Sequence, residues 1–150
     1  QAWDYFYLAE GVKTIDTFED FYNAEKGIAY VWSTDNVAKI PPNLHGHDSH
    51  IKLAKLTPNE MVFQYSSSEN EFLVVADAWH PLWHAKIDGD ETKIIKANGI
   101  FKGVLLPPGE HAVRFFFDNS VFFPGVWVTL IAWSLFLGGW VWISIKEKNT

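Results

Sequence analysis

The sequence predicts a mainly β fold, an antiparallel β-sandwich of jelly-roll type followed by one C-terminal transmembrane α-helix. Short runs rich in valine, isoleucine, phenylalanine and tyrosine recur from residue 28 to residue 117, and turn residues separate them about every eight to twelve positions. An uncharged apolar stretch follows them. Short, regularly spaced strands are typical of sandwiches and jelly rolls, whereas a βαβ fold alternates strands with helical patterns. The chain therefore divides into a predicted sandwich domain (1–120), a membrane span (121–145) and a tail (146–150).

The predicted strands either alternate apolar and polar residues or are rich in β-branched and aromatic side chains. In the last strand, Val113, Phe115 and Phe117 share one face, and the residues between them share the other. The strands are expected at residues 28–33, 50–56, 61–66, 71–78, 84–88, 92–96, 100–106 and 111–117.

Turn residues connect these strands. Asp88-Gly89 lies between two alternating runs, and this dipeptide tolerates the positive φ angles of a type I′ hairpin turn. Pro107-Pro108-Gly109 closes the strand before the last one. Residues 1–27 are expected to be partly irregular or helical. A short helix is predicted over Thr14–Ala24, with Thr17 as its N-cap and Asp20 at the third helical position.

The uncharged stretch Val121–Ile145 predicts a membrane-spanning helix that starts within a few residues of Pro124. Twenty-five helical residues reach about 37 Å, which exceeds the roughly 30 Å hydrocarbon core of a bilayer. A soluble helix of this length would show a polar face, and a 150-residue chain could hardly surround it. Aromatic residues lie near both ends of the stretch, as in interfacial belts: Phe122, Phe123, Trp127, Trp140 and Trp142.

The flanking charges predict the orientation of the span. Lys146 and Lys148 follow it at once, whereas Asp118 precedes it. The positive-inside rule then places residues 146–150 in the cytoplasm and residues 1–120 outside a bacterial cytoplasmic membrane, with membrane lipid as a partner.

Composition excludes some functions. The formal charge of −6 and the lack of a basic stripe argue against nucleic acid as a partner. The absence of cysteine fits an exported domain that does not rely on disulfides. The first ten residues, QAWDYFYLAE, lack the apolar core of a signal peptide. Either a signal was removed before Gln1, or the chain is the end of a longer protein.

The segment from Leu73 to Phe117 keeps a pattern of spaced residues that a transmembrane helix follows: Asp77, Pro81, Trp83, Ala85, Asp88, Gly89, Ile94, Ala97, Asn98, Phe101, Val104, Pro107, Gly109, His111, Val113 and Phe115. On these residues the segment resembles the C-terminal extracytoplasmic module of YfhO-like bacterial membrane proteins, in which a transmembrane helix also follows. Leu82 and Lys102 depart from the family pattern, which usually has glycine and often arginine there. Members of this family are similar to polytopic glycosyltransferases that use lipid-linked sugar donors. The resemblance implies that their catalytic acidic residues lie upstream of anything in this chain, so no catalytic residue and no cofactor are expected here.

The candidate binding residues for a glycan or a protein partner are Asp77, Trp79, Trp83, Asn98 and Lys102. Tryptophan faces stack on sugar rings, and a carboxylate accepts hydrogen bonds from sugar hydroxyls. The structural alternative pairs a buried Asp77 with turn amides and lets Asn98 hydrogen-bond its own bend. Interfacial anchoring is a further alternative for the tryptophans. Trp83 is expected in the core and Trp79 in contact with a ligand, on a rim of the sandwich near the membrane.

Three histidines, His45, His47 and His50, form a weak candidate metal site for zinc or copper. Their segment follows a proline pair and is predicted to be a loop, so solvated histidines are the simpler interpretation. His80 and His84 are four residues apart, but Pro81 between them argues against a helical pair of ligands. No nucleophile elbow, phosphate-binding loop or Cys/His zinc signature is present.

Three functional classes remain open from the sequence. The first is the C-terminal part of a YfhO-like, glycosyltransferase-related membrane protein, whose sandwich contacts a lipid-linked sugar, a glycan or a partner. The second is a free-standing, single-pass accessory subunit that docks on a larger membrane protein complex. The third is an enzyme that uses the histidine loop with a metal, which the lack of catalytic motifs disfavours.

Overall fold

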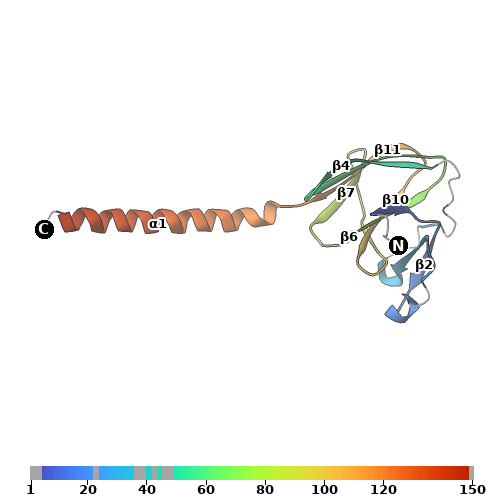
Figure 1. Cartoon of the computed structure of the whole chain (residues 1–150), viewed down its shortest axis with the longest axis horizontal. Helices are drawn as coiled ribbons and strands as arrows, with labels where there is room; N and C mark the ends of the chain where they lie inside the picture. Colours follow the sequence, from blue (N-terminus) through green and yellow to red (C-terminus); the bar gives the residue numbers. More distant parts are fainter. Residues whose placement is uncertain (1–4, 22–23, 36–39, 42–43, 45–48, 149–150) are drawn as a thin grey trace. The chain divides into compact units, whose positions relative to one another are not determined.

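The computed structural model describes residues 5–21, 24–35, 40–41, 44 and 49–148. These residues form two β-sheets with a sandwich-like arrangement and one long C-terminal helix, which confirms the predicted fold class. The chain separates into two units, Gln1–Phe117 and Asp118–Thr150, and the sheets lie in the first (Figure 1).

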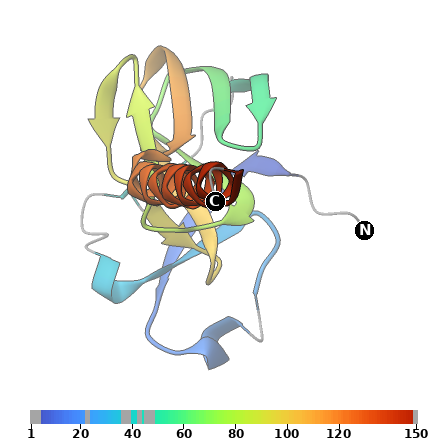
Figure 2. The ribbon, with the colours of Figure 1, turned by 90° about the vertical axis from the view of Figure 1, so that its left-hand side faces the viewer.

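Sheet A has six strands, and its edges are formed by the N-terminal part of the chain, drawn in blue in Figures 1 and 2. Neighbouring strands are antiparallel except for β2 and β3, which are parallel. The strand order is β1 (Phe6–Leu8), β6 (Glu71–Ala78), β10 (Phe101–Leu106), β9 (Ile95–Ala97), β3 (Ile28–Trp32) and β2 (Gly11–Ile15).

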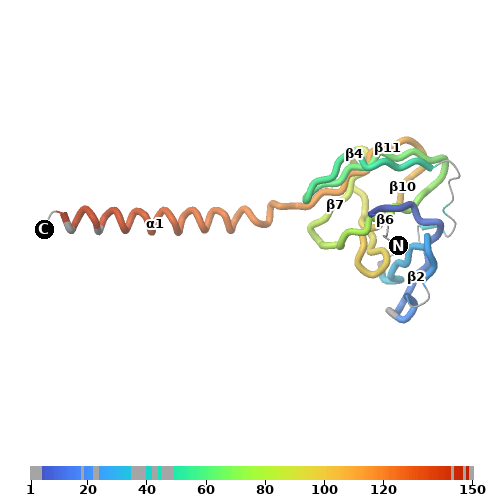
Figure 3. The backbone as a smooth tube through the Cα atoms, in the orientation of Figure 1, coloured from blue at the N-terminus to red at the C-terminus, as the bar shows by residue number. Residues whose placement is uncertain are grey.

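Sheet B has five antiparallel strands, and its central strand β11 is the one that leads to the C-terminal unit, as the tube in Figure 3 shows. Strand β11 pairs along its length with β5 and along its second half with β7. The strand order is β4 (His50–Thr57), β5 (Glu60–Ser67), β11 (Gly109–Phe117), β7 (Trp83–Ile87) and β8 (Asp90–Thr92).

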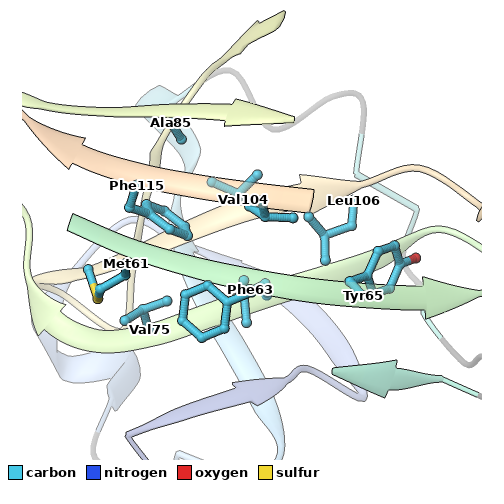
Figure 4. Packing of buried hydrophobic residues seen from close by; sticks show 10 residues of the cluster. Met61, Phe63, Tyr65, Val75, Ala85, Val104, Leu106 and Phe115 are labelled. Atoms are coloured by element: carbon cyan, nitrogen blue, oxygen red, sulfur yellow. The ribbon is translucent and has the colours of Figure 1, made fainter. Parts of the chain in front are cut away.

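The main hydrophobic core lies between the two sheets (Figure 4). Strands β5 and β11 bury alternate residues, as expected for strands with one face toward a core. Phe63 and Phe115 are fully buried and meet edge to face, with ring centroids 6.0 Å apart. Val113 shares their side of the sheet, which confirms the predicted inward face of the last strand. The buried members are Met61, Phe63, Tyr65, Leu73, Val75, Ala85, Val104, Leu106, Val113 and Phe115.

A second cluster covers the other face of sheet A. Strand β6 places Leu73 and Val75 in the main core, and it places Phe72 and Val74 in the second cluster with residues of β3 and β9. Both faces of β6 are therefore buried, which explains why this strand is a continuous apolar run rather than an alternating one.

The predicted strand at residues 92–96 is wrong, because the chain changes sheets within it. Strand β8 ends at Thr92 in sheet B, and β9 begins at Ile95 in sheet A. Ile94 packs against the main core at the crossing. The alternation breaks at the crossing, because Ile94 packs against the main core whereas the adjacent Ile95 is buried in the second cluster.

The predicted helix Thr14–Ala24 is also wrong in extent. Thr14 and the residue after it belong to β2, and only the short 3₁₀ helix η1 (Phe18–Phe21) follows. Only the half of the expected capping arrangement that Asp20 supplies is present among the hydrogen bonds of this segment. The Oδ2 atom of Asp20 accepts hydrogen bonds from the backbone N–H of Thr17 (3.0 Å) and of Asp16 (3.1 Å). A second short 3₁₀ helix, η2 (Ser33–Asp35), follows β3.

The hairpin predicted at Asp88-Gly89 is confirmed. Ile87 pairs with Asp90, so Asp88 and Gly89 alone form the loop. Both have positive φ, 51° at Asp88 and 99° at Gly89, as a type I′ turn requires.

The C-terminal unit contains the 3₁₀ helix η3 (Ser120–Phe122) and the α-helix α1 (Phe123–Lys148). The helix starts one residue before Pro124, where proline is tolerated because a first-turn N–H has no helical partner. Within the described residues, α1 is the one helix long and apolar enough to cross a membrane, and its apolar stretch is not buried.

Candidate contact site at one end of the sandwich

A β-bulge brings three of the five predicted binding residues together. Phe101 pairs with Ala78, but Lys102 pairs with Val75, so two extra residues of β6 bulge out at this point. A bulge re-aims the side chains that it carries. Asp77 lies in the bulge and meets Lys102, at the start of β10.

Lys102 has a fully buried side chain whose ammonium group is held from two directions. Its Nζ lies 2.6 Å from Oδ2 of Asp77 and 3.4 Å from the centre of the Trp83 ring. Burial lowers the pKa of Lys102, and the hydrogen bond to Asp77 opposes that shift. The Asp77 carboxylate is 35% exposed, so one end of this ion pair faces water. The structural alternative predicted that turn amides bind Asp77. Its partner is instead the ammonium group of Lys102.

Trp83 is part of the framework of this site. One face of its ring carries the Lys102 ammonium, and the rings of Trp83 and Phe117 meet edge to face at a centroid distance of 5.5 Å. The ring is half-buried and packs against the main core. A sugar cannot stack on the ring face that the ammonium group occupies. These contacts favour a structural role for Trp83.

Trp79 lies in the loop after β6 and is also half-buried. Its backbone N–H donates to the carbonyl of Ile100 at 2.7 Å, which holds the loop against the start of β10. The Nζ atom of Lys96 lies 4.1 Å from the centre of the Trp79 ring. Such cation–π contacts at partly exposed sites contribute about 0.5–1 kcal/mol each.

Asn98 has a different set of contacts. Its φ is 49°, a conformation that asparagine adopts more readily than most residues. Its Oδ1 accepts a hydrogen bond from the backbone N–H of Tyr30 (2.8 Å), and its Nδ2 donates to the hydroxyl of Tyr7 (2.7 Å). Asn98 thus joins β1 and β3 instead of bonding its own bend, and these contacts do not involve Asp77, Lys102 or Trp83. Burial raises the pKa of Tyr7, and this hydrogen bond opposes the shift.

Of the three candidate metal ligands, only His50 lies in the part of the chain that the structure describes. His50 is exposed at the start of β4, opposite Ser66. His45 and His47 lie outside the described residues. Among the described residues, no group of three histidine, aspartate or glutamate side chains is arranged to hold a metal ion.

His80 and His84 contact different aromatic rings. The ring of His80 lies beside Phe117, and that of His84 stacks on Phe116 with centroids 5.5 Å apart. His80 also accepts a hydrogen bond from the backbone N–H of Leu82 through Nδ1 (3.2 Å). Leu82 has no positive φ, so its side chain does not strain a turn in which the resembling family has glycine.

Sequence reasoning missed an ion pair that fastens the β7–β8 hairpin to β11. Nδ1 of His111 lies 2.6 Å from Oδ2 of Asp88, while Oδ1 of Asp88 accepts the backbone N–H of Ala112 (2.8 Å). The N–H of Ala112 and the imidazole lower the pKa of Asp88, and the carboxylate raises the pKa of His111. Both residues belong to the pattern in Leu73–Phe117, but only the register of β7 on β11 brings them together.

No known family model matches the chain, and no curated protein or solved structure matches it at a significant level. The YfhO-like resemblance stays a prediction that rests on the residues of the segment Leu73–Phe117.

Proposed function

We propose that this chain is a non-catalytic, membrane-anchored β-sandwich, with residues 1–120 outside the bacterial cytoplasmic membrane and α1 across it. One observation carries the proposal. The apolar stretch of α1 is not buried. Large side chains such as Trp133, Leu135 and Phe136 are each more than half exposed. A helix that is apolar on all sides requires lipid or other apolar helices around it.

The first unit supports this proposal because its hydrophobic clusters consist of its own residues. Its two sheets bury their own apolar faces in two clusters of residues from Ala9 to Phe115. The positive flank Lys146 and Lys148 favours a cytoplasmic tail. The sequence pattern in Leu73–Phe117 favours the C-terminal part of a YfhO-like, glycosyltransferase-related protein. A free-standing accessory subunit on a larger membrane complex is the alternative, and the same anchor would serve both.

The anchor can be tested with single cysteines, since the sequence contains none. Asn119→Cys and Lys148→Cys place one thiol on each side of the proposed span. The chain would be exported in bacteria behind a cleavable signal and treated with a membrane-impermeant maleimide. We expect labelling of Cys at 119 in intact cells and at 148 only after permeabilisation. Labelling of both in intact cells would show that the segment does not stop in the bilayer.

A second candidate function, contact with a lipid-linked sugar, is favoured at Trp79 rather than at Trp83. The Trp79 ring is partly exposed and carries one lysine, whereas the Trp83 ring is held by Lys102, by Phe117 and by the core. The Asp77 carboxylate nearby in sequence is one-third exposed, and its bond to Lys102 uses only Oδ2.

The probe for this second function is a polyprenyl-phosphate-linked monosaccharide in nanodiscs that hold the chain. Trp79→Ala should weaken binding of the probe about tenfold, as loss of an aromatic stacking contact of about 1.4 kcal/mol would do, while the domain keeps its melting temperature. The matched control is Trp32→Ala, on β3 of sheet A. Equal binding by wild type and Trp79→Ala would remove the candidate.

A further inference from the structure

Four side chains gather on the outer face of sheet B, near the end of β11 that leads toward α1. Phe116 and Arg114 come from β11, and they pair in register with His84 and Lys86 of β7. We call these four residues the exit patch. None of the candidate contact residues belongs to it.

The exit patch is built around one aromatic ring. The ring of His84 stacks on Phe116, the guanidinium carbon of Arg114 lies 5.0 Å from the ring centre, and Nζ of Lys86 lies 5.7 Å from it. Phe116 is half-buried although it points away from the core, because cationic and imidazole side chains cover it. Basic side chains laid along an apolar ring are typical of residues at a membrane interface.

Three cations and two carboxylates lie in this part of the sheet. Lys55 lies in the same cross-strand row as Arg114 and Lys86. Glu60 accepts a bond from Nε of Arg114 (2.5 Å) and also binds Lys55, so one carboxylate faces two cations. Glu91 is in register with Lys86, but no ion pair joins these two in the described residues. The terminal nitrogens of Arg114 and the ammonium of Lys86 thus have no carboxylate partner among the described residues.

We propose that the exit patch docks on the anionic phospholipid headgroups of the bilayer that anchors α1. This inference rests on the proposed membrane anchoring. Only residues 118–122 separate the end of β11 from α1, and five residues extend at most about 18 Å. The patch begins one residue before that tether, so the tether keeps the patch close to the headgroup region of the bilayer. The chain as a whole carries −6, and an anionic surface would therefore repel most of its other faces.

The experiment uses the full chain in nanodiscs, with a nitroxide attached at Val62→Cys. Val62 lies between Lys55 and Arg114 on the outer face of sheet B. Collisional accessibility to oxygen and to a water-soluble nickel chelate reports whether the label touches lipid. A label at Glu110→Cys, at the other end of β11, serves as the reference position. Discs of neutral phosphatidylcholine are compared with discs that also contain phosphatidylglycerol.

We expect phosphatidylglycerol to shield the label at residue 62 from nickel and leave the reference label unchanged. Each cation near an anionic surface contributes about fivefold to the ratio of docked to undocked chains. Lys86→Gln, which breaks no ion pair among the described residues, should lower that ratio about fivefold, and Lys86→Gln with Arg114→Gln about 25-fold. The matched control is Lys13→Gln with Lys26→Gln, which removes the same charge and also breaks an ion pair, that of Lys13 with Glu25.

The possible outcomes separate the two proposals. A chain that fails to incorporate into discs would overturn both the membrane anchor and the docking. A chain that incorporates, but whose label at residue 62 is equally open to nickel in both lipids, would refute the docking alone. An equal loss in the control double variant would also refute it, because a general charge effect would then explain the result.

Discussion

Phe115 and Phe136 are the same side chain in two regions with opposite surroundings. Phe115 is fully buried between the sheets, whereas Phe136 of α1 is 66% exposed. In the first region, chain segments far apart in sequence cover one another, so the apolar surface stabilises the domain itself. In the second region the helix satisfies its own backbone but leaves its side chains to the surroundings, as a membrane span does. Apolar composition alone therefore does not tell whether a side chain stabilises the folded domain or faces its surroundings.

The largest expected effect on stability comes from a substitution in the core of the sandwich, and the same substitution in α1 should have none. Phe115→Ala should lower the unfolding free energy of the sandwich by about 3–5 kcal/mol, because it leaves a cavity in the core. Phe136→Ala, the matched variant, should leave it unchanged, since Phe136 belongs to neither hydrophobic cluster of the sandwich. Thermal unfolding of both variants in detergent measures the difference. Similar losses in the two variants would show that helix and sandwich stabilise one another.

A smaller effect tests the half-open ion pair at the end of the sandwich. Asp77→Ala strands the buried Lys102 ammonium and should cost about 2–3 kcal/mol, less than for a fully buried pair because Asp77 is one-third exposed. Lys102→Met should cost less, since an apolar side chain of similar length then fills the site and Asp77 can be hydrated. Denaturant unfolding at neutral pH ranks the two. A larger loss for Lys102→Met would mean that the ammonium itself holds the site together.

The smallest expected effect is a change in the pH dependence of the sandwich. The pKa of His111 is raised from 6.5, so its contribution is complete below that pH and is lost as pH rises through the folded pKa. The pKa of Asp88 is lowered from 3.8, so its contribution is present above that pH and is lost as pH falls through the folded pKa. Asp88→Asn keeps a residue that tolerates positive φ and should flatten melting temperature against pH at both ends.

Asp90→Asn, in the same hairpin, is the control for this pH experiment. It removes an exposed carboxylate of the same kind. An unchanged profile in Asp88→Asn, or an equal flattening in the control, would contradict the role given to the pair of Asp88 and His111.

The sequence predicts strands well where the pattern is local. Strands β5, β6, β10 and β11 lie within a residue or two of the predicted positions, because side-chain alternation or an apolar run marks them. Strands β1 and β2 escaped prediction, since β1 has only three residues and depends on β6 for its hydrogen bonds. The alternation breaks at Ile94-Ile95, where the chain changes sheets, but such a break does not tell which sheet the next strand joins.

The candidate site shows the same limit. Asp77 and Trp83 were grouped because they are close in sequence, but the residue that joins them is Lys102, 25 positions after Asp77. Lys102 comes close to Asp77 only through the pairing of β10 with β6 and the bulge in that pairing, and local composition predicts neither. Asn98 reaches Tyr30 and Tyr7 across 68 and 91 positions, so no local pattern indicated its contacts.

The most direct test of the central claim is extraction of the full chain from bacterial membranes with alkaline carbonate. Carbonate releases proteins that are held only by charge or by peripheral contacts, whereas a helix inserted in the hydrocarbon core stays. A parallel sample of Leu135→Arg with Phe136→Arg, which puts two charges at the middle of α1, should lose about 5–7 kcal/mol of insertion free energy. We predict that the wild-type chain remains in the membrane pellet and that the double variant is released. Release of the wild-type chain into the carbonate supernatant would contradict the membrane anchor.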